Sequence, residues 1–349
     1  MFQKCAVWNG PGRVELVEKP LVPLAEGALR VRVEACAVCG SDLRILKHGN
    51  ARVAPGRTLG HEIAGMVVEL GAGTKRFRVG DRIAIGADVP CGECVHCKNG
   101  RPNCCDVNYA IGHQFEGGFA EYIDLNKLTV DLGPVHRVND TIPFSVAALA
   151  EPLACCLNGY ERALMQPGRS VAIFGAGPIG MMLAMLAPSQ GASQVIMIDP
   201  VASRLEKAKA LGVVHVINPE SEDPVERAMA LTNGAGVDTI FTACAMRQTH
   251  EQAMRMVAKR GVINLFGGLP KDSAPVALDS NWIHYREAYI TGSHGSTPEQ
   301  HARAVALIEQ GKVDVGALIT HHFSLADIGK AYAMAGSGEA IKVVVNPHA

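Results

Sequence analysis

The stretch Val171-Ala172-Ile173-Phe174-Gly175-Ala176-Gly177-Pro178-Ile179-Gly180 decides the fold of the second half of this chain. Four β-favouring residues run directly into Gly-x-Gly-x-x-Gly, and an apolar segment follows from Met181 to Ala187. A strand that ends in a glycine turn and restarts as a helix presents unpaired backbone N–H groups and the positive end of a helix dipole. The stretch therefore predicts a seat for a pyrophosphate.

Each glycine of this loop has a distinct expected role. The first permits the tight turn, the second lets phosphates approach the backbone, and the third lets helix and strand pack closely. We expect the loop to bind a dinucleotide through Gly175, Gly177, Pro178, Ile179 and Gly180.

A carboxylate stands where the adenosine ribose of such a dinucleotide would lie. Asp199 directly follows the second strand, Gln194 to Ile198, and lies 19 residues past Gly180. That spacing is typical of the acidic residue that accepts hydrogen bonds from the ribose 2′-OH. Asp199 would repel a 2′-phosphate, so the sequence predicts NAD rather than NADP. Arg204, one turn further on, is an additional cofactor-binding candidate and a weak argument for NADP.

Length and composition exclude several classes of protein. The 349 residues suffice for two domains, and 33 Lys and Arg nearly balance 34 Asp and Glu. Nothing in this charge predicts a nucleic-acid or membrane partner. The N-terminus lacks a signal-peptide core, and no apolar run approaches the roughly 18 residues of a membrane span. We expect a cytoplasmic protein whose 11 cysteines hold metal rather than form disulfides.

Strands and helices alternate after residue 168, as in a parallel sheet with helices on both faces. Helical patterns occupy Ala202–Leu211 and Pro224–Leu231, and Pro188 should end the first helix about one turn early. The expected strands are Val171–Phe174, Val195–Ile198, Val214–Ile217, Thr239–Ala243, Val262–Phe266 and Ala288–Thr291.

The first part of the chain is β-rich and punctuated by glycine and proline, which favours a barrel-like domain. Expected strands include Val14–Val17, Leu29–Val33 and Ile63–Leu70, and a helix is expected over Ala147–Gly159. The tail from Pro298 to Pro347 reads as helix, strand, helix and strand, and should return to this first domain.

Four cysteines form a compact set with the spacing C-x2-C-x2-C-x7-C. Four thiolates on one short loop match the closed tetrahedral set of a structural zinc, which leaves no position open for a substrate. Cys104 adjoins the last member and could replace it, but Cys105 is the preferred ligand. The expected ligands are Cys91, Cys94, Cys97 and Cys105.

These motifs, taken in order, resemble the zinc-dependent medium-chain dehydrogenases over nearly the whole chain. The resemblance rests on Cys39-Gly40-Ser41-Asp42, Gly60-His61-Glu62, the cysteine set, Gly117 to Tyr122, Glu151-Pro152 and the glycine loop. Glutamate at 151, where alcohol dehydrogenases carry cysteine, is similar to the sorbitol and polyol dehydrogenase branch.

The resemblance implies a two-domain α/β architecture. A GroES-like β-rich catalytic domain would comprise residues 1–156, including a structural-zinc lobe at 88–108, and residues 293–349. A Rossmann domain with a doubly wound parallel sheet would occupy residues 157–292, with the active cleft at the junction.

The resemblance also implies a catalytic zinc that three protein ligands and an open position would hold. Cys39 and His61 would bind it directly, and Glu62 or Glu151 would bind directly or through water. The zinc would act as a Lewis acid on the substrate hydroxyl, from which hydride passes to nicotinamide. Ser41 would relay the proton outward, or alternatively cap the following helix.

Some residues depart from the sorbitol and threonine dehydrogenase patterns. Arg44 stands where those enzymes often have histidine, and the stretch after Gly292 lacks the Arg-Tyr pair of sorbitol dehydrogenase. His294, in that stretch, could face the pocket or sit in a turn. The segment that borders the family's substrate cleft could grip an anionic substrate or simply be solvated; its basic residues are Arg44, Lys47, His48, Arg52 and Arg57.

The sequence thus predicts a zinc- and NAD-dependent oxidoreductase acting on a secondary alcohol or ketone of a polyol or sugar-like small molecule. The alternatives are a dehydrogenase of a polyol phosphate, sugar acid or threonine-type amino alcohol, and a non-catalytic dinucleotide-binding protein. We expect two zinc ions per chain, and a homo-oligomer, either a dimer or a tetramer.

Overall fold

A computed structural model describes residues 1–270 and 272–349. The chain divides into two compact units, one of Met1–Ala154 with Gly295–Ala349 and the other of Cys155–His294. The first unit therefore contains both chain ends. The domain boundaries expected from the sequence lie after residues 156 and 292.

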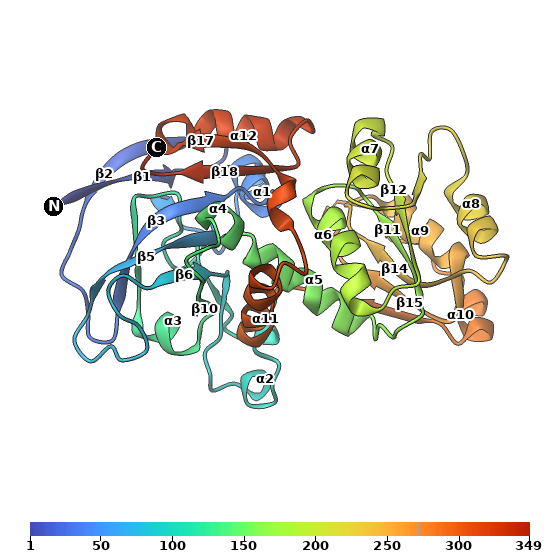
Figure 1. Ribbon diagram of the computed structural model, residues 1–349, viewed down its shortest axis with the longest axis horizontal. Helices are drawn as coiled ribbons and strands as arrows, with labels where there is room; N and C mark the ends of the chain where they lie inside the picture. Colours follow the sequence, from blue (N-terminus) through green and yellow to red (C-terminus); the bar gives the residue numbers. More distant parts are fainter. Residues whose placement is uncertain (271) are drawn as a thin grey trace. The chain divides into compact units, whose positions relative to one another are not determined.

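The first unit is built on a mixed sheet in the order β10-β6-β5-β3-β18-β17, with β9 also paired to β3. Strand β18 joins it antiparallel to β3 through Val344 opposite Ala37 and Val345 opposite Cys36. This pairing brings the C-terminal segment, red in Figure 1, beside the blue N-terminal strands. The strands are β3 (Leu29–Ala37), β5 (Glu62–Leu70), β6 (Arg82–Ile85), β9 (Tyr122–Leu125), β10 (Val135–Arg137), β17 (Ile319–Ser324) and β18 (Lys342–Asn346).

Two smaller sheets complete this unit. One has the order β2-β1-β4, from β1 (Phe2–Trp8), β2 (Val14–Pro20) and β4 (Arg57–Thr58), and the other pairs β7 (Asp88–Val89) with β8 (Tyr109–Ala110). Buried aliphatic residues of β3, β5 and β18 form the core. The helices are α1 (Gly40–His48), α2 (Val95–Lys98), α3 (Lys127–Leu132), α4 (Phe144–Ala147), α11 (Pro298–Glu309) and α12 (Ile328–Ser337).

The single helix predicted over Ala147–Gly159 is wrong in its boundaries. The structure has α4 ending at Ala147 and a separate α5 over Ala150–Arg162. Pro152 explains the break, because its ring would clash with the carbonyl four residues earlier in a continuous helix. Restarting at Ala150 puts Pro152 in the first turn, where its missing N–H is harmless.

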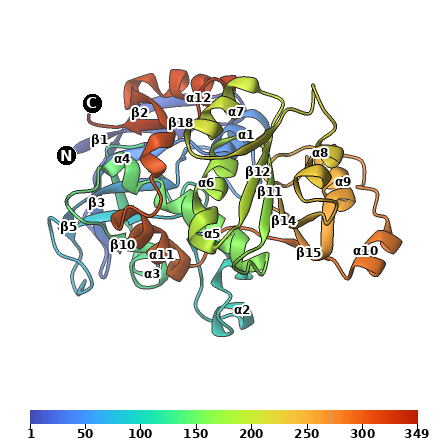
Figure 2. The ribbon, with the colours of Figure 1, turned by 45° about the vertical axis from the view of Figure 1, so that its right-hand side comes forward.

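The second unit is a six-stranded parallel sheet in the order β13-β12-β11-β14-β15-β16. Figures 1 and 2 show α6 and α9 on opposite faces of it, which is the doubly wound arrangement. Its strands are β11 (Ser170–Phe174), β12 (Gln194–Ile198), β13 (His215–Ile217), β14 (Val237–Thr242), β15 (Val257–Leu265) and β16 (Tyr289–Gly292). Its helices include α6 (Pro178–Leu186), α7 (Ala202–Ala210), α8 (Pro224–Leu231), α9 (Arg247–Met256) and α10 (Ser280–Arg286).

Two details of this unit depend on individual residues. Helix α6 ends at Leu186 and a 3-10 turn over Ala187–Gln190 follows, as expected for Pro188. Strand β15 begins at Val257, earlier than the expected Val262. Arg260 (φ 59°) bulges within the strand and interrupts the alternation of side chains, so the sequence pattern indicates only its later part. Among the described residues, no helix is long and apolar enough to cross a bilayer.

Candidate functional site

The glycine loop has the strand-turn-helix geometry of a phosphate seat. Gly175 directly follows β11 with φ 99°, and Gly177 precedes α6 as its N-cap, with Pro178 in the first turn. A Cβ on Gly180 would lie 1.7 Å from the Gly175 carbonyl oxygen, so only glycine permits this contact. A Cβ on Gly177 would meet nothing within 4 Å among the described residues. The backbone there is open to a ligand, and Ile179 follows in the first turn of the helix.

Asp199 holds this loop in shape. It follows β12, its residue is only 5% exposed, and its Oδ2 accepts a 2.7 Å hydrogen bond from the Ala176 backbone N–H. Its Oδ1 accepts another, of 2.8 Å, from the Val201 backbone N–H. Each carboxylate oxygen still has a further lone pair for a ribose hydroxyl. Arg204 lies in the first turn of α7, half-buried.

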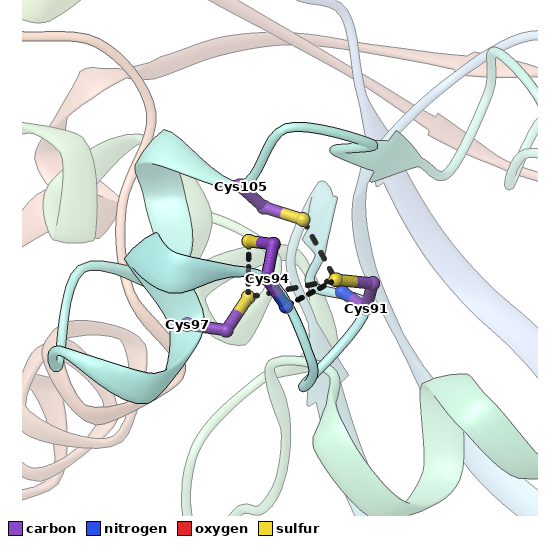
Figure 3. Close-up of side chains that lie close together, drawn as sticks. All are labelled: Cys91, Cys94, Cys97 and Cys105. Atoms are coloured by element: carbon purple, nitrogen blue, oxygen red, sulfur yellow. Dashed lines mark hydrogen bonds between the residues drawn. The ribbon is translucent and has the colours of Figure 1, made fainter.

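The four spaced cysteines converge in the first unit (Figure 3). The Cys94 and Cys97 sulfurs are 3.5 Å apart, and those of Cys91 and Cys97 are 3.9 Å apart. Four sulfurs at about 2.3 Å around a tetrahedral zinc would be separated by about 3.8 Å. No disulfide forms among the 11 cysteines, all of which lie in the described part of the chain. The donor set therefore fits a zinc ion with four thiolate ligands.

Backbone amides around this loop favour the thiolate forms of Cys94 and Cys105. The Cys91 N–H and the Asn108 N–H each lie 3.3 Å from the Cys105 sulfur. Amides of Cys97 and Asp106 lower the pKa of Cys94. Cys104, the alternative ligand, is exposed, whereas Cys105 is buried within the set.

A second group brings together Cys39, His61 and Glu62, whose ligand atoms lie within 4.8 Å of one another. Cys39 precedes α1 as its N-cap, and Glu62 opens β5 just after His61. His61 and Glu62 are buried. A thiolate, an imidazole and a carboxylate at this separation fit a catalytic zinc, since such sites use three protein ligands and keep one position open.

Asp42 and Ser41 surround the His61 ring. Asp42, 1% exposed, lies 3.6 Å from His61 Nδ1 and accepts a 2.9 Å hydrogen bond from the Cys39 N–H. Ser41 Oγ lies 3.3 Å from His61 Nε2. A carboxylate behind a ligating histidine fixes the orientation and tautomer of its ring. No sequence pattern identifies Asp42 as a site residue, because its contact with His61 depends on the fold.

Glu62 is paired with Lys342 of β18. The Lys342 Nζ lies 2.7 Å from Glu62 Oε1 and 2.5 Å from Oε2, and it also donates to the Val38 carbonyl at 3.0 Å. Both side chains are almost fully buried. Burial alone would lower the pKa of Lys342, but Glu62 and Cys39 hold it above its ordinary value. No sequence pattern points to Lys342, which lies 280 residues from Glu62.

Glu151, near the start of α5, is buried beside this group but is not among the three closely spaced ligands. Burial raises the pKa of Glu151 to about 7; His61 opposes the rise, and Glu62 and Asp88 add to it. A carboxylate in this position would be stabilised by a cation.

His113 was not identified from the sequence, yet its ring centroid lies 6.3 Å from that of His61, edge to face. Burial, His61 and Arg52 lower the pKa of His113 to about 4.

Two residues of the basic segment already have partners within the protein. Arg57 forms an ion pair with Glu116, and Arg52 donates to the Asn108 carbonyl. Arg44, Lys47 and His48 are exposed on α1. His294 is exposed, and its carbonyl accepts a hydrogen bond from Asn158.

Known proteins match both units of the chain. Residues 25–132 match the alcohol dehydrogenase GroES-like domain family, and residues 178–310 match the zinc-binding dehydrogenase family. A sorbitol dehydrogenase from Halalkalibacterium halodurans is 30% identical over 97% of each chain. An L-threonine 3-dehydrogenase from Thermococcus kodakarensis is 33% identical, covering 96% of this chain and 95% of the relative.

Solved structures agree with these matches. A zinc-binding dehydrogenase from Sinorhizobium meliloti, bound to NADP, superposes with a TM-score of 0.92 and 31% identity, covering 99% of this chain and 100% of that one. The predicted α/β fold with GroES-like and Rossmann parts is confirmed, as is the prediction of an oxidoreductase. The chain belongs to the zinc-dependent medium-chain dehydrogenases, in their sorbitol and polyol dehydrogenase-like branch.

Proposed function

We propose that this enzyme uses NAD to oxidise a secondary alcohol of a polyol or sugar-like compound, or reduces the matching ketone. The observation that carries the proposal is the buried group of Cys39, His61 and Glu62, with the Glu151 carboxylate beside it. Thiolate, imidazole and carboxylate donors suit zinc, and a carboxylate can alternate between direct and water-mediated contact. Such a site can accept two neighbouring substrate oxygens.

Each residue of the group has a role in this proposal. Zinc bound there supplies Lewis-acid polarisation of the substrate hydroxyl, and nicotinamide supplies the hydride acceptor. Cys39 and His61 would hold the metal, and Asp42 would keep the His61 ring oriented. Ser41 would accept the proton from the substrate hydroxyl while its own hydroxyl proton passes to solvent water.

Of the two glutamates, we assign direct or water-mediated metal contact to Glu151. The charge of Glu62 is already balanced by Lys342, at 2.5 Å and 2.7 Å. Moving Glu62 to the metal would leave a buried ammonium without its carboxylate, which is unfavourable. Glu62 would then support the site through charge rather than as a permanent ligand. The quartet of Cys91, Cys94, Cys97 and Cys105 would hold the second, structural zinc.

The proposed cofactor is NAD rather than NADP. Asp199 is negatively charged at the predicted ribose position, and a 2′-phosphate would meet that charge. The relative from Sinorhizobium meliloti is bound to NADP, which makes the preference of this chain worth direct measurement. The loop residues Gly175, Gly177, Pro178, Ile179 and Gly180 would contact the pyrophosphate through the helix N-terminus.

A threonine-type substrate is the second candidate, supported by the similarity to L-threonine 3-dehydrogenases. Arg44 argues against it, since it replaces the histidine those enzymes often have. An anionic polyol or sugar acid is less well supported than the sequence indicated, because Arg57 is already paired with Glu116.

We also propose that the enzyme is a cytoplasmic homo-oligomer. Strand β16 is an edge of the parallel sheet, and Tyr289 and Ile290 on it are 57% and 39% exposed. An edge strand with exposed apolar side chains favours pairing with a second copy of the chain. Light scattering on the purified protein would measure the number of subunits.

A substrate and cofactor screen tests the function. We expect 2,3-butanediol, sorbitol or xylitol to be oxidised faster than 2-butanol or ethanol, with NAD giving a higher kcat/KM than NADP. Reduced-nicotinamide absorbance measures both. If ethanol or 2-butanol proved as good as every diol and polyol, the polyol assignment would be wrong. Faster turnover of L-threonine would favour the second candidate instead.

A further inference from the structure

His113 occupies a rigidly held position next to the proposed catalytic group. It follows β8 and Gly112, whose φ is 75°. A Cβ on Gly112 would lie 3.2 Å from the Gly60 nitrogen and oxygen, so the loop packs directly on the residue before His61. The Ile111 N–H donates to the Ala87 carbonyl at 3.0 Å, which fixes the other side of the loop.

The His113 ring has a hydrogen-bonding atom with no partner in the described part of the chain. Its Nδ1 is buried and makes no hydrogen bond there. Its ring centroid lies 6.3 Å from that of His61, with the planes at 73°. A buried polar atom without a partner is unfavourable and is usually explained by a missing ligand or water.

His113 does not belong to the metal-ligand set. Only Cys39, His61 and Glu62 place their ligand atoms within 4.8 Å of one another in this region of the described structure. The His113 ring meets the His61 ring edge to face, outside that set. A neutral imidazole offers one donor and one acceptor, which suits a hydroxyl group.

We propose that His113 is a specificity-determining residue that hydrogen-bonds a second substrate hydroxyl, adjacent to the one that is oxidised. This inference rests on the proposed polyol function and deepens it, since it assigns vicinal diols as the substrate class. A mono-alcohol would leave the His113 nitrogen unpaired, and a site built to bind a hydroxyl discriminates against analogues that lack it.

The test compares a diol with a mono-alcohol in matched variants. In His113→Leu, we expect kcat/KM for 2,3-butanediol to fall about 10- to 100-fold, while that for 2-butanol changes less than about 3-fold. His113→Gln keeps a hydrogen-bonding side chain and should recover part of the diol activity. His136→Leu replaces another largely buried histidine of the same unit, and should leave the ratio of the two substrates unchanged.

The outcomes separate this inference from the proposed function. Wild-type enzyme that shows no preference for diols would overturn both. Wild-type enzyme that prefers diols, with the same preference in His113→Leu and His113→Gln, would overturn the role of His113 alone. Equal losses for both substrates would assign His113 a structural role instead. NAD binding measured by fluorescence checks that each variant is folded, and His113→Gln carries the test if His113→Leu does not fold.

Discussion

The two cysteine-containing groups of the first unit differ in how their members are brought together. Cys91, Cys94, Cys97 and Cys105 lie on one loop, and their set is complete before the rest of the chain is considered. Cys39, His61 and Glu62 come from the start of α1 and the start of β5, and the Glu62 charge is balanced by Lys342 from the last strand. A closed zinc site can be local, whereas a site with an open position depends on the whole domain.

The donor atoms explain why the two groups suit different tasks. Four thiolates fill a tetrahedron and exclude a substrate. The mixed group has one thiol, one imidazole and carboxylates, and the Lys342 ammonium removes the effect of one negative charge. Without Lys342 the site would be more negative, and loss of a proton from a bound hydroxyl would be harder. Charge balance is therefore part of the proposed chemistry.

The largest expected difference between the groups is in turnover. Cys39→Ala should lower kcat/KM at least about a thousand-fold, because Lewis-acid catalysis contributes several kcal/mol. NAD binding should persist, since the glycine loop lies in the other compact unit. Absorbance assays and fluorescence titration measure the two properties. Cys5→Ala, at a buried thiol outside both groups, is the control, and a fully active Cys39→Ala enzyme would remove the catalytic assignment.

Breaking the buried ion pair should have the next largest effect, which is a loss of stability. Lys342→Met leaves Glu62 buried without its cation, which typically costs about 3–5 kcal/mol. We expect this loss in protein depleted of metal and a smaller loss with zinc present, because zinc can then balance Glu62. Denaturant unfolding in both states measures the effect.

The matched double variant is Lys342→Met with Glu62→Gln, which should recover much of the stability. If the double variant is as unstable as Lys342→Met alone, lost packing rather than lost charge balance is the cause.

Cys94→Ser tests the closed group. It should lower the free energy of unfolding by about 3 kcal/mol, or Tm by roughly 6–12 °C, because metal binding and folding are coupled. Metal analysis should fall from two zinc ions to one, with the remaining ion at the Cys39 group. The exposed Cys104→Ser variant should keep both ions. Loss of zinc in Cys104→Ser would reverse the preference for Cys105.

A hydrogen-bonded pair of histidines without a cysteine ligand extends the comparison to a third group, and it has the smallest expected effect on stability. His136 Nδ1 and His301 Nδ1 lie 2.9 Å apart and share a hydrogen bond. Burial, aided by His136, lowers the pKa of His301 to about 3. The unfolded chain binds a proton near pH 6.5 that the folded protein excludes, so stability falls as pH drops below that value.

Between pH 7 and pH 5 this group should cost about 2 kcal/mol of stability. The free energy of unfolding of His301→Leu should fall by about 2 kcal/mol less than that of the wild type over the same interval. Denaturant unfolding measures this difference, with metal content checked at each pH. Equal pH dependence in both proteins would show that His301 protonates freely. Burial lowers the pKa of the neighbouring His136 to about 4; Arg76 adds to this effect and Glu299 opposes it.

The sequence predicts what is local and misses what the fold assembles. The glycine loop, its helix and the spaced cysteines are contiguous patterns, and the structure has them where they were expected. Asp42, Lys342 and His113 carry no pattern of their own. Lys342 reaches Val38 across 304 residues, and only the pairing of β18 with β3 creates that contact.

Secondary structure shows the same division. Helix α8 has the predicted bounds because Asp223 caps it and Pro224 opens it. Helix α5 begins later than predicted because the ring of Pro152 would clash with a carbonyl of the preceding turn. The resemblance to a known family supplied the catalytic ligand set, which spacing alone would not have assembled.

The two hydrogen bonds of Asp199 have a consequence for cofactor engineering. Its carboxylate holds Ala176 and Val201 at 2.7 Å and 2.8 Å before any dinucleotide arrives. The loop is preorganised, so binding need not spend conformational entropy to order it. Replacing Asp199 to convert the enzyme to NADP would therefore loosen the pyrophosphate seat as well as remove a ribose contact. Redesign for NADP would have to supply a new acceptor for the Ala176 amide together with a cation for the phosphate.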